Sequence, residues 1–252
     1  MVYKKDEIKI IREGGRRLAE ILRKVAKEVR PGTSTKKLDR LAEKLIREGG
    51  DEPAFLNYTP NGDKFPYPAT LCVSINNEVV HGIPGDKRIL KEGDIVGLDL
   101  GLKHAGFFTD MAMTVPVGKI DKEAKNFIEV VEKSLVKGIA AAKGGGFIGD
   151  IGETIENLVK SRGYSIVSIL GGHGVGKKVH EDPHVPNYGK SGTGPKLVPG
   201  MVLAIEPVVN EGSGKVFLDN DGYTFKTRDG KRSAHFEHTI LITEGKAEIL
   251  TS

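Results

Sequence analysis

The chain has 252 residues and a net charge of +4, and 38% of its residues are hydrophobic against 29% charged. These values are typical of a globular protein with a sizeable core, and they exclude a disordered or fibrous chain. No apolar run approaches the ~18 residues of a membrane span, and the first residues lack the apolar stretch of a signal peptide. The single cysteine, Cys72, excludes an intramolecular disulfide and a cysteine-built zinc site. We therefore expect a protein of the reducing cytoplasm.

The charge is unevenly distributed along the chain. Residues 1–50 contain 15 Lys and Arg against 8 Asp and Glu, whereas the remainder is slightly acidic. A basic first fifth could bind an anionic partner such as ribosomal RNA, or it could reflect the solvent-facing sides of two amphipathic helices. We favour the second interpretation and keep the ribosome as a candidate partner.

The first part of the chain predicts two helices followed by strands. Apolar residues at helical spacing predict a helix over residues 6–29, which Pro31-Gly32 ends. A second helix has Ser34 or Thr35 as its N-cap and Gly49-Gly50 as its end. A Pro-rich loop then leads to strands. The predicted strands cover residues 70–75, 78–83, 94–102 and 107–115, and the last two form a hairpin with its tip at residues 104–106.

The same order of elements occurs again in the second part. Helices are predicted over residues 122–142 and from Asp150 or Gly152 to near Gly163. Strands follow over residues 164–170, 201–210, 222–227 and 233–243. The repetition predicts an internal duplication, with halves of roughly residues 1–118 and 119–252.

Matched sequence segments support the duplication. Residues 93–99 (GDIVGLD) align with residues 200–206 (GMVLAIE), and residues 108–114 align more loosely with residues 235–241. Each half therefore contributes two acidic residues at matching positions. These residues are Asp99 and Asp110 in the first half, and Glu206 and Glu237 in the second.

The four carboxylates predict a metal centre. Asp99 and Glu206 lie in otherwise apolar strands, where an unpaired carboxylate is costly. Ion pairs with Lys or Arg would satisfy each carboxylate singly, but four carboxylates gathered in one place require cations. Two divalent ions bridged by carboxylates supply that charge. Oxygen-rich ligation with one imidazole suits Mn, Fe, Co or Zn and does not rank them.

Seven histidines are candidates for the remaining roles. His173 lies between glycines that allow close backbone approach, so it is the candidate histidine ligand. His180 is a candidate hydrogen-bonding or proton-transfer group. For His81, at the end of a strand, functional and structural roles are equally open. His184 is expected to be a loop or packing residue, and the other three histidines are expected to be structural or solvent-facing, namely His104, His235 and His238.

Six separated segments together resemble type I methionine aminopeptidases. They are SINNEVVHGIP (74–84), GFFTD (106–110), GHGVG (172–176), HEDP (180–183), AIEP (204–207) and FEHT (236–239). The resemblance runs over essentially the whole chain, in order. It implies an α+β pita-bread fold in a single catalytic domain, residues 1–252. Such a domain has two pseudo-symmetric halves, a curved and mostly antiparallel sheet, and helix pairs on its outer face.

The resemblance also implies a ligand set and a reaction. Asp110 and Glu237 would bridge two divalent ions, Asp99 would bind one of them and face the substrate's amino group, and His173 and Glu206 would complete the other. The implied reaction hydrolyses the bond after an N-terminal methionine in peptides and nascent proteins, through attack of a metal-bridging hydroxide. Its implied catalytic residues are Glu206 as general base and acid, His180 as donor to the substrate or oxyanion, and His81 beside the tetrahedral intermediate or leaving amine.

The substrate pocket is implied by the same resemblance. Tyr67 and Cys72 fall where the family lines its apolar pocket, and Cys72 needs no reactivity for that purpose. Val179 and Tyr223 occupy positions where other members often carry larger aromatic residues. The loop over residues 57–68 departs from the family pattern, and residues 61–64 within it resemble an insertion.

Related families share the implied fold. Prolidase and aminopeptidase P use the same five ligands but usually carry an extra N-terminal domain, for which we expect no room here. Type II methionine aminopeptidases carry a helical insertion that the short interval from Glu206 to Glu237 does not accommodate. A non-enzymatic binding protein on this scaffold would have lost ligands, and all five are present. We expect a monomer, with no membrane or specific DNA partner.

Overall fold

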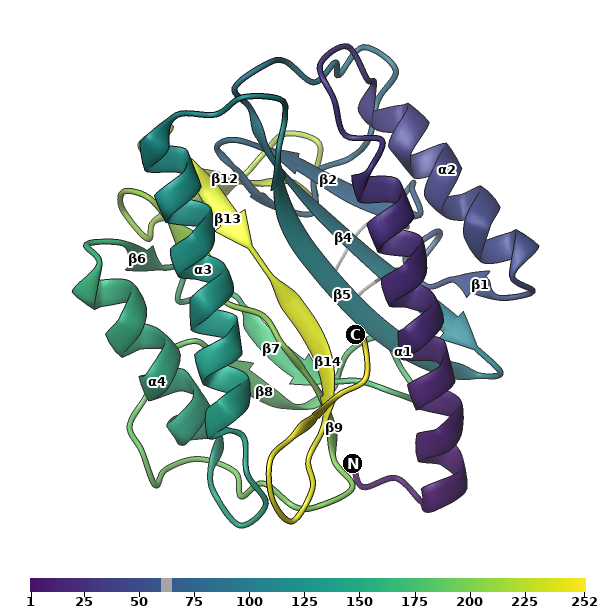
Figure 1. Ribbon diagram of the computed structural model, residues 1–252, viewed down its shortest axis with the longest axis vertical. Helices are drawn as coiled ribbons and strands as arrows, with labels where there is room; N and C mark the ends of the chain where they lie inside the picture. The colour runs from purple at the N-terminus through teal and green to yellow at the C-terminus, as the bar shows by residue number, and fades with distance from the viewer. Residues whose placement is uncertain (60–64) are drawn as a thin grey trace.

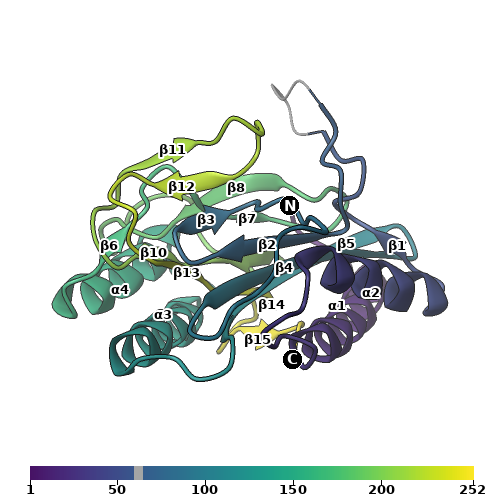
Figure 2. The ribbon, with the colours of Figure 1, turned by 90° about the horizontal axis from the view of Figure 1, so that it is seen from above.

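The computed structural model describes residues 1–59 and 65–252. The residues expected to form an insertion, 61–64, lie outside this part. Within it, a nine-stranded sheet carries all four helices on one side, while the hairpin of β11 (Val216–Leu218) and β12 (Phe225–Thr227) lies on the other (Figures 1 and 2). No helix in the described residues is long and apolar enough to cross a lipid bilayer.

The first helix pair confirms the predicted elements. Helix α1 (Lys5–Ala26) ends three residues before the predicted boundary, and helix α2 (Thr35–Glu48) begins after Ser34. The Ser34 hydroxyl accepts a hydrogen bond from the Lys37 N–H at 3.3 Å, which satisfies one of the free donors at the helix start. At the other end, Gly50 takes a positive φ of 78°, a conformation that glycine adopts without steric cost.

The second helix pair follows the same plan with one corrected boundary. Helix α3 (Lys122–Ala141) is capped by Asp121, which accepts the Ala124 N–H at 2.6 Å. Helix α4 (Ile148–Ser161) begins before the predicted start at Asp150 or Gly152. Asp150 lies inside the first turn and accepts the Phe147 N–H at 2.7 Å, so its carboxylate stabilises the helix start without being the N-cap.

The main sheet joins strands from both parts of the chain in the order β1-β4-β5-β14-β9-β7-β8, with β2 beside β4 and β15 beside β14. All these pairs are antiparallel. The strands are β1 (Glu52–Pro53), β2 (Leu71–Ile75), β4 (Ile95–His104), β5 (Phe107–Pro116), β7 (Gly171–Gly174), β8 (Glu181–Pro186), β9 (Val202–Ile205), β14 (Glu237–Leu241) and β15 (Glu248–Ile249).

Two small sheets flank the main one, each with three strands among the described residues. They contain β3 (Glu78–Val80), β6 (Ser165–Ile166), β10 (Val208–Asn210), β11 (Val216–Leu218), β12 (Phe225–Thr227) and β13 (Ser233–His235). The single strand predicted over residues 201–210 is wrong, because Glu206-Pro207 divides it into β9 and β10. Proline cannot donate to a strand ladder, so the chain leaves the sheet there. Similarly, Phe236 separates β13 from β14.

Each helix pair packs on its own apolar cluster. One cluster joins α1 and α2 to β2 and β4, with Leu18, Leu38 and Leu98 fully buried. The other joins α3 and α4 to β9 and β14, with Phe127, Ile155 and Leu203 fully buried. The main sheet is therefore covered by a close-packed apolar core under each helix pair, which fixes the positions of its strands.

Strands β5 and β14 meet at the seam between the two parts of the chain. In this register Ala112 lies opposite Glu237. Asp110 and Thr239 exchange two hydrogen bonds through the threonine hydroxyl, at 2.9 and 2.8 Å. Strands β5 and β14 therefore bring one carboxylate from each part of the chain to the same place.

Candidate metal centre and substrate pocket

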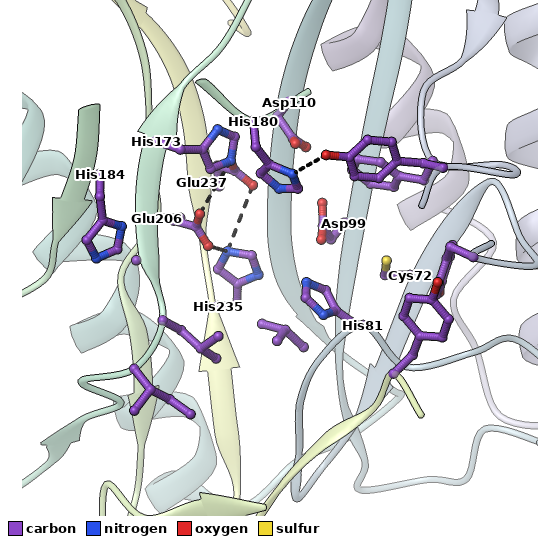
Figure 3. Close-up of a pocket in the computed structure, with 18 residues that line it drawn as sticks. Cys72, His81, Asp99, Asp110, His173, His180, His184, Glu206, His235 and Glu237 are labelled. Carbon is purple, nitrogen blue, oxygen red and sulfur yellow. Dashed lines mark hydrogen bonds and ion pairs between the residues drawn. The ribbon is translucent and has the colours of Figure 1, made fainter. Parts of the chain in front are cut away.

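A cavity of about 370 Å³ gathers residues from both parts of the chain. It brings together every residue that the sequence predicted for the site: Tyr67, Cys72, His81, Asp99, Asp110, His173, His180, Glu206, Tyr223 and Glu237. Figure 3 shows the acidic side chains and His173 turned toward one another, with Cys72 to one side.

The four carboxylates come from separate places in the sheet. Asp99 lies in the middle of β4, Asp110 on the adjacent β5, Glu237 at the start of β14, and Glu206 at the break after β9. Asp110 and Glu237 are only 4% and 2% exposed. One buried oxygen in each of Asp99, Asp110 and Glu237 has no hydrogen-bond partner among residues 1–59 and 65–252. Buried oxygens of this kind require a cation or a proton.

The electrostatics of the cluster separate Glu206 from the other carboxylates. Burial, with neighbouring carboxylates, raises the pKa of Asp110 and Glu237 well above the usual range. Burial likewise raises the pKa of Asp99 to about 6, against the lowering effect of His235. Burial acts in the same direction on Glu206, but the adjacent His235, with His173 and His180, lowers its pKa below the usual value. Glu206 is therefore the carboxylate that remains ionised most readily.

The tautomer of His173 follows from its hydrogen bond. The ring Nδ1 lies 2.9 Å from the Gly174 carbonyl oxygen, which can only accept, so Nδ1 carries the proton. In the neutral ring, Nε2 then presents a lone pair. Nε2 points toward Glu206, 3.6 Å from Oε1. A backbone carbonyl that fixes the second nitrogen in this way is typical of metal-ligating histidines.

These residues fit a divalent cation. Ligand atoms of Asp110, His173 and Glu237 all lie within 4.8 Å of one another. Carboxylate oxygens with one imidazole nitrogen form a donor set for first-row divalent metals. The unpartnered carboxylate oxygens of this cluster supply the negative charge that such an ion would neutralise.

Two further histidines border the cluster. The His180 ring lies 4.5 Å from the His173 ring, centroid to centroid, and its Nδ1 lies 2.9 Å from the Tyr58 hydroxyl. Burial and the neighbouring His173 lower the pKa of His180 to about 4, so its ring is neutral near pH 7. His81 follows β3 with a positive φ of 58° and lines the cavity, packing edge-on against Phe225.

Beside the carboxylates lies an apolar compartment. Tyr67 and Tyr223 pack edge to face with their ring centroids 5.2 Å apart, and the Tyr67 hydroxyl donates to the Gly82 carbonyl at 3.0 Å. Cys72 is buried, and burial, with the nearby Asp99, raises the pKa of its thiol. Val179 packs in the same cluster. This compartment has the character of a pocket for an apolar side chain.

The cavity also contains residues that the sequence did not indicate. His235 is buried, with Nε2 at 3.3 Å from Glu206 Oε2 and 3.9 Å from Glu237 Oε2, although neither contact has full hydrogen-bond geometry. Of the two positions expected for His235, structural or solvent-facing, its burial excludes the second. His184 is not in a loop but on β8, and it lines the cavity, as do Phe55 and Tyr58. In contrast, His104 has the expected structural role, with Nδ1 at 2.7 Å from Asp51.

Comparisons with known proteins identify the family. The sequence profile of metallopeptidase family M24 matches residues 9–244. Methionine aminopeptidase 1 of Bacillus subtilis (strain 168) is 47% identical over 97% of this chain and 96% of its own length. The chain belongs to the methionine aminopeptidases of metallopeptidase family M24.

Solved structures agree with this assignment and with the pita-bread fold. The crystal structure of methionine aminopeptidase from Rickettsia prowazekii superposes with a TM-score of 0.96 at 36% identity, covering 100% of this chain and 99% of that one. The prolidase from Pyrococcus horikoshii OT3 reaches a TM-score of 0.76 at 25% identity, and the match covers only 63% of its length. The methionine aminopeptidases are thus the better match in both sequence and extent.

Proposed function

We propose that this protein is a metal-dependent aminopeptidase that hydrolyses the bond after an N-terminal methionine in peptides and nascent proteins. One observation carries the proposal. Carboxylates from both parts of the chain, with unpartnered buried oxygens, meet His173 at the end of an apolar compartment. The cavity can therefore hold cations and an apolar side chain next to each other. The family relationship supports the same activity.

We propose that two divalent ions bind in this cluster, with Mn, Fe, Co or Zn as candidates. Asp110 and Glu237 would bridge them, since these two carboxylates come from the paired strands β5 and β14. Asp99 would hold one ion, and His173 with Glu206 would hold the other. When bound, the ions would supply Lewis acidity that acidifies a water molecule and polarises the scissile carbonyl.

The protein's own side chains would then direct the reaction. Glu206 would accept the proton of the attacking water and return it to the leaving amine, consistent with its persistently ionised carboxylate. His180 would donate a hydrogen bond to the substrate carbonyl oxygen, where negative charge develops. His81, which also lines the cavity, would stabilise the tetrahedral intermediate or assist the leaving amine. Asp99 would also face the free amino group of the substrate.

The apolar compartment would receive the methionine side chain. Tyr67, Cys72 and Tyr223 enclose it with largely apolar surface. A thioether packs well against aromatic rings, and the buried Cys72 offers a small apolar contact. This arrangement would hold the methionine carbonyl next to the carboxylates.

Peptidase assays after metal removal test the proposal. Protein treated with a chelator should release no methionine from a Met-Gly-Ser peptide, and Mn, Fe, Co or Zn added singly should restore release to different extents. The same preparations should leave an Xaa-Pro dipeptide largely intact. Preference for the Xaa-Pro substrate would contradict the proposal, as would methionine release that survives complete metal removal.

We also propose a setting for this activity. The chain would act as one catalytic domain and as a monomer in the cytoplasm, with halves of roughly residues 1–118 and 119–252. Contact with the ribosome would use Lys24, Lys27 and Lys37, which line a shallow groove between α1 and α2. Reversing these charges should weaken co-sedimentation with ribosomes and leave cleavage of short peptides unchanged. Unchanged sedimentation would favour the solvated-helix interpretation, which the many ion pairs on these helices also support.

A further inference from the structure

The loop between β7 and β8 carries two residues that matter for the proposed function, one lining the cavity and one packed in the apolar compartment. Residues 175–180 connect the strand of His173 to β8 without belonging to either strand. Val179, which is 3% exposed, packs in the apolar compartment with Cys72. The next residue, His180, contacts His173 and Tyr58. The conformation of this loop therefore sets both a wall of the pocket and the position of the His180 ring.

The back of the same loop is held by a side chain from the N-terminus. Tyr3 donates its hydroxyl proton to the Glu181 carboxylate, whose two oxygens lie at 3.0 and 2.9 Å. The Lys177 N–H donates to the Tyr3 hydroxyl at 3.0 Å and to Glu181 Oε1 at 2.7 Å. The Lys178 N–H donates to the same oxygen at 2.8 Å. The hydroxyl and the carboxylate together satisfy the backbone donors of the turn that leads to His180.

The fit between Tyr3 and the loop is close. A Cβ atom on Gly176 would lie 2.2 Å from the Tyr3 hydroxyl oxygen, and Gly176 has a φ of +148°. Only glycine permits this approach and this backbone conformation together. The Gly176 carbonyl also accepts the Phe108 N–H at 2.6 Å, which ties the loop to β5.

Tyr3 itself has a fixed position. It is 5% exposed, its N–H donates to the Gly200 carbonyl at 2.9 Å, and its ring packs edge-on against Phe107. The neighbouring Val2 forms a bridge with Met201. A side chain held on three sides can restrain a loop, because the hydroxyl cannot follow if the loop moves.

We infer that Tyr3 is a positioning residue for the substrate-binding loop, through which the N-terminal segment sets the placement of His180 and Val179. The inference rests on the proposed function, since it concerns how strongly the methionine substrate binds. Tyr3 does not line the cavity. Its effect passes through Glu181 and the backbone of residues 177–178 to His180, which lines the cavity, and to Val179, which packs in the apolar compartment.

The expected effect of removing the Tyr3 hydroxyl on substrate binding follows from the fraction of molecules in which the loop has its binding-competent conformation. Without the hydrogen bond from Tyr3, Glu181 loses an anchor and the loop occupies its competent conformation for a smaller fraction of the time. The apparent affinity for substrate falls by that fraction, while saturating substrate restores the competent loop. A hydrogen bond to a charged group contributes enough that we expect KM to rise about tenfold in Tyr3→Phe, with kcat changed less than about twofold.

Tyr3→Phe is best compared with Tyr188→Phe, which removes a hydroxyl from a tyrosine that is 41% exposed and lies outside the cavity. Kinetics with the Met-Gly-Ser peptide give KM and kcat separately. Amide hydrogen exchange at Lys177 and Lys178, measured on the metal-free chain, reports on the loop without any catalysis. We expect faster exchange at both amides in Tyr3→Phe only. Glu181→Gln should reproduce the rise in KM, and the double variant should add little to either single change.

Two results would overturn the inference. One is an unchanged KM in Tyr3→Phe at a temperature where the variant is folded, even if its melting temperature falls, since that pattern indicates a purely structural residue. The other is unchanged amide exchange at residues 177–178. Failure of the proposed function gives a different result, because the unaltered protein would then release no methionine, while exchange would still show whether Tyr3 holds the loop.

Discussion

Replacing Asp99 with asparagine should make the metal-free protein more stable and at the same time weaken its metal binding. Burial, with the nearby Glu206, raises the pKa of Asp99 to about 6 from its ordinary 3.8. A pKa shift of this size corresponds to a free-energy difference of about 3 kcal/mol between the two protonation states. Above pH 6 the folded, metal-free protein carries this cost, whereas an asparagine at position 99 carries none.

The sign of the pH dependence follows from linkage. The folded state holds the Asp99 proton more tightly than the unfolded state, so the stability from this group is present below about pH 4 and is lost as pH rises through about 6. At about pH 7.5 in the presence of chelator, the free energy of unfolding of Asp99→Asn should therefore exceed that of the unaltered protein by up to about 3 kcal/mol. For a chain of this size, that difference raises the melting temperature by roughly 6–12 °C. At about pH 5 the difference should shrink.

Thermal unfolding with and without metal gives the assay. Added metal at about 100 times its Kd should stabilise the unaltered protein by about 2.7 kcal/mol and stabilise Asp99→Asn less, because a ligand is gone. Asp86→Asn, at an exposed side chain, is the matched control and should change stability by less than about 0.5 kcal/mol. Glu206→Gln should make the metal-free protein less stable, since His235 keeps the pKa of Glu206 low despite burial. A metal-free Asp99→Asn that melts at or below the unaltered protein at neutral pH would refute the reasoning.

Further substitutions test other parts of the site. His173→Ala should abolish methionine release while circular dichroism shows an unchanged fold, and retained activity would mean that the metal centre lies elsewhere. His235→Leu should weaken metal affinity about 10- to 100-fold by calorimetry, because the imidazole beside Glu206 orients that carboxylate. His235→Gln keeps a hydrogen-bond donor and should therefore lose less metal affinity. Equal metal affinities in the two variants would contradict this role of His235. Cys72 should resist alkylation in the folded protein near pH 8 and react once the chain unfolds, since burial and Asp99 raise the pKa of its thiol; rapid labelling of the native chain would contradict the buried position.

Local patterns in the sequence were sufficient to predict the helices and the acidic cluster. The helices have strong apolar periodicity and recognisable end signals such as Ser34 and Gly49-Gly50, so their signals lie within a few residues of each other. Asp99 and Glu206 stand out because each interrupts an apolar strand, and the internal repeat pairs them. Such patterns can be recognised in the sequence without knowledge of the tertiary structure.

Other features depend on contacts that the sequence does not reveal locally. The predicted start of α4 is wrong because Asp150 accepts a hydrogen bond from inside the first turn, a pattern that resembles an N-cap in sequence. Tyr58 reaches His180 from a loop without periodicity, and Tyr3 meets Glu181 across 178 positions of chain. For His235 a signal did exist. Within the strand predicted over residues 233–243, positions two apart would face the same side, which makes the position two before Glu237 a candidate for the cavity; although Phe236 divides that strand, both side chains do line the cavity.

The seam between β5 and β14 explains why the cluster needs both parts of the chain. Asp110 and Thr239 exchange hydrogen bonds there, and Thr114 and His235 do the same at 2.8 and 3.0 Å. A slip of one residue would turn Glu237 away from the cavity, because side chains alternate between the faces of a strand. The two threonine hydroxyls therefore fix the register that sets Asp110 and Glu237 beside each other. Two ionised carboxylates in this position would repel each other, so in the metal-free protein the raised pKa values of Asp110 and Glu237 favour a bound proton, and the hydrogen bonds at this seam keep the two residues side by side until a cation replaces it.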